Sequence, residues 1–77
     1  MICETDIVCE NCILRGKVTN FYTTYDISKV LSVSISSDGV NYVETDEFEV
    51  VDGMLWYKGS FSDGDRLRIK YIGLYEV

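Results

Sequence analysis

The amino-acid sequence predicts an all-β fold, a small antiparallel meander of roughly five to six strands forming a sandwich or a partly open barrel. Three observations lead to this prediction. Apolar and polar residues alternate over most of the chain, which is typical of strands with one buried face. The dipeptide Asp-Gly recurs between these segments and favours tight hairpin turns. No segment has the length and periodicity of a stable helix.

The first dozen residues differ in character from the rest, because all the cysteines of the chain lie there. We therefore expect residues 1–12 to form an N-terminal arm and residues 13–77 to form a single small β domain. A first strand is expected over 13–22, with a bulge or bend at Gly16. The chain contains no proline and shows no linker to a second domain.

The Asp-Gly dipeptides then divide the domain into strands. Asp38–Gly39 and Asp52–Gly53 are each expected to join a hairpin, and Asp63–Gly64 leads into the last strand. The expected strands lie near residues 30–36, 40–45, 47–51, 54–58 and 66–72. In the first of these, the side chains expected to face the core are Leu31, Val33 and Ile35, with serines between them facing outward.

The segment "RLRIK" is the concentrated patch of positive charge in the chain. In a strand, Arg66, Arg68 and Lys70 point to one face, and the apolar residues between them point to the other. One interpretation is cross-strand pairing with Glu47 and Glu49 of "EFEV". The other is a rim of charge that binds an acidic surface of a partner protein, and both stay open here.

The aromatic segment "MLWYK" indicates a second contact surface. Neighbours in a strand point to opposite faces, so Trp56 and Tyr57 cannot both be buried under a single layer. We expect either Met54 with Trp56, or Leu55 with Tyr57, to contact a partner protein.

The C-terminal "IGLYEV" carries apolar side chains that are costly to expose. Gly73 is expected to end the strand, which leaves Leu74, Tyr75 and Val77 on a tail. Such a tail either closes the chain's own barrel or adds to a neighbouring molecule as a docking strand, and Leu74 and Tyr75 are interface candidates.

The three cysteines, Cys3, Cys9 and Cys12, are compatible with three structural roles. They are buried as small apolar residues, they cross-link to another chain, or they bind a structural zinc ion. Zinc needs four ligands, and the chain has no histidine to complete the set, so we expect no cofactor. Thiol catalysis is disfavoured because the neighbouring acidic residues raise the pKa of a thiol.

Composition and charge exclude several classes of function. A net charge of −6 argues against a nucleic-acid partner, and no apolar run is long enough to cross a membrane. The acidic N-terminus does not resemble a secretory signal, so we expect folding in the cytoplasm. The absence of histidine, of a nucleophile elbow and of a phosphate loop argues against an enzyme. Asp63 and Asp65 lack the further ligands of a calcium loop.

The run "VSISSDGVNYVETDEFEVVDGMLWYKGSFSDGDRLRIKYIG" resembles the small β modules of tailed-bacteriophage virions. The likeness covers about residues 30–73. It consists of a short strand, "DGV", a segment ending in aromatic, acid and valine, then "DG" with a hydrophobic strand, and "GD" before an alternating strand. The resemblance implies a non-enzymatic structural protein of the virion, folded in the host cytoplasm. It would decorate the capsid or belong to the neck, tail, baseplate or a fibre, and would bind other virion proteins and copies of itself.

An alternative rests on the segment "VSISSDGVNYVE", which is similar to a strand and turn of discoidin-like domains. This resemblance implies a small carbohydrate-binding module with a glycan as its partner. Those domains are longer than this chain, and Tyr42 stands where their pattern prefers tryptophan.

Overall fold

The computed structural model describes residues 1–16, 20–21 and 23–77, and these residues form seven strands. The strands are β1 (Ile2–Ile13), β2 (Asn20–Phe21), β3 (Asp26–Ser36), β4 (Val43–Glu44), β5 (Phe48–Val51), β6 (Met54–Tyr57) and β7 (Arg66–Glu76). Every pairing is antiparallel, and the all-β prediction is confirmed. The described ranges include no helix, and hence none with the length and apolarity of a membrane span.

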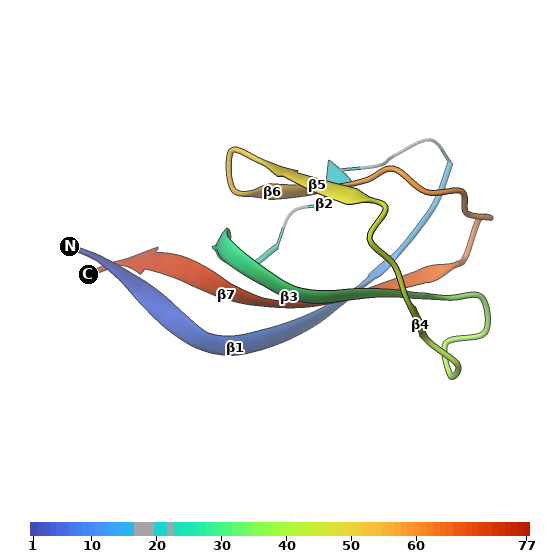
Figure 1. Cartoon of the computed structure of the whole chain (residues 1–77), viewed down its shortest axis with the longest axis horizontal. Helices are drawn as coiled ribbons and strands as arrows, with labels where there is room; N and C mark the ends of the chain where they lie inside the picture. The colour runs from blue at the N-terminus through green and yellow to red at the C-terminus, as the bar shows by residue number, and fades with distance from the viewer. Residues whose placement is uncertain (17–19, 22) are drawn as a thin grey trace.

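Two sheets lie face to face and enclose the core (Figure 1). One sheet has four strands in the order β1-β7-β3-β4, and the other has three in the order β2-β6-β5. The sheets are not closed into a barrel, so the fold is the predicted sandwich. β1 and β7 run side by side past the end of the smaller sheet, and both termini lie together at that end (Figure 1).

The Asp-Gly turns lie where the sequence predicts them. β3 pairs with β4 across the turn that contains Asp38–Gly39, and β5 pairs with β6 across Asp52–Gly53. Asp52 has φ of 51° and Gly53 has φ of 77°, which are the two positive values that a type I′ turn needs. Asp63–Gly64 lies just before β7.

The strand order is not that of a simple meander, because β7 does not pair with the strand before it. β7 crosses to the other sheet and lies between β1 and β3. There, Leu67, Ile69 and Tyr71 are fully buried. Burying a Leu or Ile side chain contributes about 1.5–3 kcal/mol, so β7 supplies much of the stability of the sandwich.

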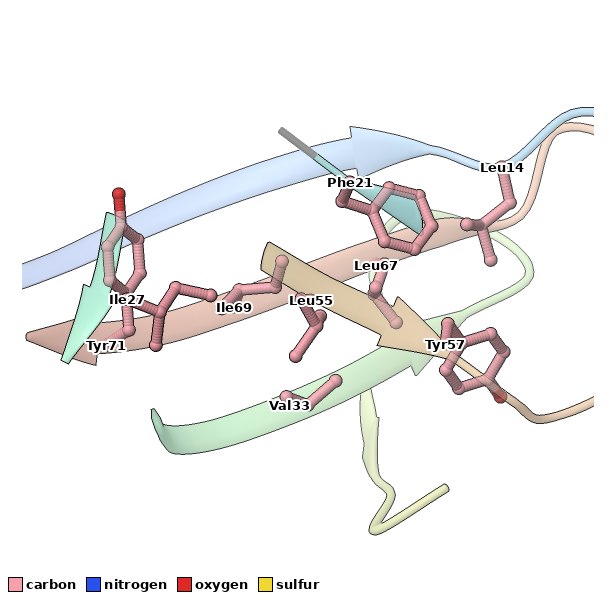
Figure 2. Close-up of a cluster of buried hydrophobic side chains, with 9 residues drawn as sticks. All are labelled: Leu14, Phe21, Ile27, Val33, Leu55, Tyr57, Leu67, Ile69 and Tyr71. Atoms are coloured by element: carbon pink, nitrogen blue, oxygen red, sulfur yellow. The ribbon is translucent and has the colours of Figure 1, made fainter. Parts of the chain in front are cut away.

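Figure 2 shows the core between the two sheets. The buried side chains come from both sheets and from the segments that join them, and they are Leu14, Phe21, Ile27, Val33, Leu55, Tyr57, Leu67, Ile69 and Tyr71. A core of this size is small, as expected for a domain of 77 residues.

Residues 2–13 form a strand of the larger sheet and not a separate arm. β1 pairs with β7 along its length, with a register shift between Glu4 and Ile7. This bulge breaks the alternation of apolar and polar residues, and the sequence pattern therefore gave no strand signal there.

The strand expected over 13–22 lies partly on residues 17–19 and 22, which are outside the described residues. In the described part, Ile13 ends β1 and Gly16 lies in a turn with φ of 61°. The short strand β2 pairs with β6.

A second bulge changes the inward face of β3. Val33 is buried and Ile35 packs against the core as predicted, but Leu31 is 41% exposed. The register of β3 on β7 shifts between Val30 and Ser32, so Val30 lies opposite Tyr71 instead. The prediction for Leu31 was wrong because alternation alone does not reveal where a bulge resets the faces.

The C-terminal strand continues through Gly73 and ends at Glu76. A Cβ atom at Gly73 would lie 2.5 Å from the Cβ of Tyr25, so the glycine allows close packing of two segments and does not end the strand. Leu74 and Tyr75 pair with β1, so the tail belongs to the chain's own sheet. Tyr75 remains 42% exposed.

Candidate functional site

The three cations of β7 lie in a row on the outer face of the four-stranded sheet. Arg66 and Lys70 are exposed and Arg68 is half-buried, whereas the residues between them belong to the core. The prediction that the three share one face is confirmed. We call this surface, with the side chains beside it on β1 and β3, the cationic face.

The strands beside β7 place no carboxylate directly opposite these cations. The flanking side chains are Ile13, Asn11 and Cys9 on β1, and Ser36, Ser34 and Ser32 on β3. Glu44 lies on β4, two strands away from β7, and is paired there with Ser34 of β3. Across residues 1–16, 20–21 and 23–77, no ion pair includes a cation of the row. A chain with a net charge of −6 thus has one face whose positive charge is not neutralised locally.

Of the two interpretations of this row, cross-strand pairing with Glu47 and Glu49 is wrong. Glu49 lies on β5, in the other sheet, where its carboxylate forms an ion pair with Lys58. Glu47 precedes β5, and its carbonyl oxygen accepts the N–H of Lys58. The two alternating segments have complementary charges, but strand order places them in different layers.

Arg68 is held in place by two neighbours. Its guanidinium carbon lies 3.9 Å from the centre of the Tyr42 ring, and its Nε donates to Asn11 Oδ1 at 3.3 Å. A cation over an aromatic face at an exposed position contributes about 0.5–1 kcal/mol. The terminal nitrogens of the guanidinium have no protein acceptor among the described residues, so these donors are available to a ligand.

The 37–42 turn brings Tyr42 and Gly39 to the cationic face. Oxygen Oδ1 of Asp38 accepts the backbone N–H groups of Val40 and Asn41, each at 2.8 Å. The hydrogen bond from Asn41, then that from Val40 and that from Ser36, hold the pKa of the Asp38 carboxyl well below its usual range. This turn is therefore fixed by its own charged cap.

Arg66 lies directly over this turn. A Cβ atom at Gly39 would lie 2.7 Å from Arg66 Nη1, and Gly39 has φ of 79°. Any larger residue at position 39 would both strain the backbone and displace the guanidinium.

An open groove of about 430 Å³ runs between β1, the 37–42 turn and β7. Its lining includes both guanidinium groups, the amide of Asn11, the ring of Tyr42 and the side chain of Ile13. Two planar cations beside an amide and an aromatic ring form a surface suited to carboxylates, because guanidinium groups bind them with paired N–H donors.

Lys29 joins the cationic face at its other end. Two register shifts in β3 flank this residue and place it opposite Ile72, so its side chain lies on the same face of the sheet as Lys70. The face therefore carries four of the seven Lys and Arg residues of the chain.

The three cysteines do not converge on a common point. Cys9 and Cys12 are three positions apart in an extended strand and face opposite sides of the sheet, about 10 Å from each other along the chain. Cys9 is exposed on the outer face, and Cys12 packs against the core. Burial, and then the charge of Glu10, raise the pKa of the Cys12 thiol. The described residues contain no cluster of ligands suited to a metal ion.

The structure decides which of the two aromatic neighbours is exposed. Tyr57 is buried in the core with 3% exposure, so it is not available to a partner protein. Trp56 is half-buried on the outer side of the three-stranded sheet, beside Glu49 and Asn20. Of the two alternatives, only Met54 with Trp56 points outward.

Sequence reasoning missed Asn11 and Lys29 as parts of the cationic face, and did not connect Tyr42 with Arg68. Asn11 belongs to residues 1–12, which were expected to form an arm, and the face on which Lys29 lies is set by bulges. Alternation therefore could not predict that either residue lies on the cationic face. Tyr42 follows a predicted turn, and only the tertiary structure brings it beside β7.

Comparisons of the chain with protein-family models, with curated proteins and with solved structures find no match.

Proposed function

We propose that this chain is a non-enzymatic structural component of a phage-like particle, and that its cationic face binds an acidic surface of another particle protein. The observation that carries this proposal is the row of Arg66, Arg68 and Lys70, which forms no ion pair within the described residues of an otherwise acidic chain. The particle is suggested by the resemblance of residues 30–73 to small virion modules.

Charge complementarity supports an acidic protein as the partner. Arg68 is fixed by Tyr42 and Asn11 before any partner binds, so little side-chain entropy is lost when it pairs with a carboxylate. Each contact is weak, but a particle presents many copies of its binding surface. Repetition raises the effective concentration and gives stable attachment without a tight single contact.

We favour protein binding over the carbohydrate-binding alternative. A sugar platform in the groove needs an exposed aromatic ring, and the ring of Tyr42 is covered on one face by Arg68. Trp56 points outward, but it lies on the other sheet, away from the groove. Tyr57 is in the core. The groove thus offers cations and an amide, which suit carboxylates better than neutral sugars.

Incorporation into particles tests the proposal. The tagged chain is produced together with the products of its neighbouring genes, and particles are separated on a density gradient. We expect the wild type to band with particles, and the variant R66Q/R68Q/K70Q to remain in the unassembled fraction. K58Q is the matched control, because Lys58 is an exposed cation on the other sheet.

The control should band like the wild type, and increasing salt should release the wild type, since ions screen exposed charges beyond about 8 Å at physiological strength. A wild-type protein that never bands with particles would refute the virion role. A triple variant that is folded and still bands normally would refute the role of the cationic face.

A further inference from the structure

The strand β1 is an open edge of the four-stranded sheet. It is 12 residues long, and its only neighbour among the described strands is β7. The opposite edge is formed by β4, which has only two residues. Proteins usually block long edges with charged side chains, proline or bulges. The bulge of β1 lies before Ile7, and the segment from Ile7 to Ile13 has no lysine or proline. Its one charged side chain, Glu10, is occupied by hydrogen bonds from Thr24 and Tyr71. The long edge is thus available for pairing with another strand.

The backbone groups that face the open edge follow from one pair of hydrogen bonds. The N–H of Leu14 donates to Asp65 O at 2.7 Å, and Leu14 O accepts the N–H of Gly64 at 2.9 Å. Because backbone groups alternate along a strand, the groups of Cys12 and Glu10 also point toward β7. The backbone groups of the alternate, odd-numbered residues point instead to the open edge; these residues are Ile13, Asn11, Cys9 and Ile7.

The side chains of these edge residues lie on the outer face, beside the cationic row. Ile7 is 66% exposed and Ile13 is 51% exposed, with the exposed Cys9 between them. Two isoleucines and a thiol are therefore exposed next to backbone groups that face no other strand in the described part of the chain. A strand added to this edge would satisfy the backbone and cover part of this apolar surface.

Like charges opposite each other disfavour most registers in which a second copy of β1 could pair near the middle of this edge. Antiparallel pairing about a two-fold axis at Cys9 places Ile7 opposite Asn11 and Val8 opposite Glu10. An axis at Glu10 would place the two Glu10 carboxylates opposite each other. An axis at Val8 would place Glu10 opposite Asp6. An axis at Ile7 would oppose Glu4 and Glu10, so among axes at residues 7–10 only the one at Cys9 keeps acidic side chains from facing each other.

We propose that β1 pairs with β1 of a second copy of this chain about a two-fold axis at Cys9, which joins two four-stranded sheets into one continuous sheet. Such an axis is perpendicular to the sheet, so both cationic faces lie on the same side. The dimer would bind a repeated acidic surface through two rows of cations. Formation of the dimer itself needs no partner protein and does not depend on the proposed function.

The register has a chemical reporter. In a hydrogen-bonded antiparallel pair the Cα atoms are about 5.5 Å apart, which is within the range of a disulfide. Oxidised glutathione would take the two hydrogens of the paired Cys9 thiols, forming one disulfide and two molecules of glutathione. Cys3 and Cys12 do not face their counterparts in this register.

The test measures mass by light scattering after size exclusion, under reducing conditions, at up to about 100 µM, where a micromolar dimer is populated. The wild type should be a dimer. Asn11→Pro should be a folded monomer, because the N–H of Asn11 faces the open edge and is not used by β7. The double variant I7K/I13K gives a second block of the edge, through charge repulsion.

With oxidised glutathione, the wild type and Cys12→Ser should form a Cys9–Cys9 disulfide, which peptide mapping identifies. Cys9→Ser should remain a dimer without a disulfide. A wild type that is monomeric at all concentrations would overturn the proposal, as would a dimer that persists in both edge variants. A disulfide through Cys3 or Cys12 in place of Cys9 would overturn the register.

Discussion

Tyr71 provides a sharp test of how the core and β1 are coupled. Its side chain is fully buried, its hydroxyl donates to the Glu10 carboxylate on β1, and the hydroxyl oxygen accepts the N–H of Tyr25 at 3.3 Å. The substitution Tyr71→Phe removes both hydrogen bonds and keeps the shape of the ring. The carboxylate of Glu10 retains the N–H of Thr24 at 3.2 Å and its hydroxyl at 3.0 Å.

The expected cost follows from these contacts. A hydrogen bond to a charged group contributes about 1.5–3 kcal/mol, and the remaining Thr24 donors favour the lower half of that range, about 1.5–2 kcal/mol. For a domain of this size, the melting temperature should fall by about 6–16 °C. Urea unfolding followed by tryptophan fluorescence measures the free energy. Tyr75→Phe is the matched control, with an expected change within about 0.5 kcal/mol, because Tyr75 is exposed on the same strand.

The same substitution changes stability at alkaline pH. Burial, and then the hydrogen bond to Glu10, raise the pKa of Tyr71 above its ordinary value of 10.0. A raised pKa in the folded state means that this contribution is fully present below pH 10 and is lost as the pH rises further. Tyr71→Phe should therefore lose less stability than the wild type above about pH 10. An unfolding free energy like that of Tyr75→Phe, with an unchanged alkaline slope, would refute the coupling.

Three further predictions concern the turn, the glycine and the thiols. Gly73→Ala should cost about 1–3 kcal/mol in chemical unfolding, because its Cβ would clash with that of Tyr25; a neutral effect would contradict this close approach. The hydrogen bonds that lower the pKa of Asp38 stabilise the fold above about pH 4, and this stabilisation is lost on acidification. Asp38→Asn should therefore flatten the dependence of unfolding free energy on pH below about pH 4; an unchanged acid slope would argue against the capped turn. Iodoacetamide should label Cys9 before Cys12 in the native protein, because Cys12 is half-buried and its pKa is raised; equal rates by mass spectrometry would contradict this.

The fold class and the hairpins could be predicted from sequence because they depend on local signals. Alternation fixes which residues of β7 face the core, and the positive φ of Asp52 and Gly53 is what an Asp-Gly turn provides. Both signals lie within a few residues of the structure that they specify.

Strand order and bulges could not be predicted in this way. β7 pairs with β1, whose residues lie more than fifty positions earlier, and no local pattern encodes that choice. The bulges near Glu4 and Val30 reset the faces, which concealed β1 as a strand and placed Leu31 outward. The cationic row was visible in the sequence, but its lack of an acidic neighbour depends on this long-range order.

Lysine footprinting of assembled particles shows which face of the protein a partner covers. Acetylation of the free protein and of the particle-bound protein is compared by mass spectrometry at Lys29, Lys58 and Lys70. If the cationic face binds a partner, Lys29 and Lys70 become protected in the particle, and Lys58 on the other sheet is labelled as in the free protein. Protection of Lys58 with full labelling of Lys70 would rule out the cationic face as the binding surface, because the partner would then cover the opposite sheet.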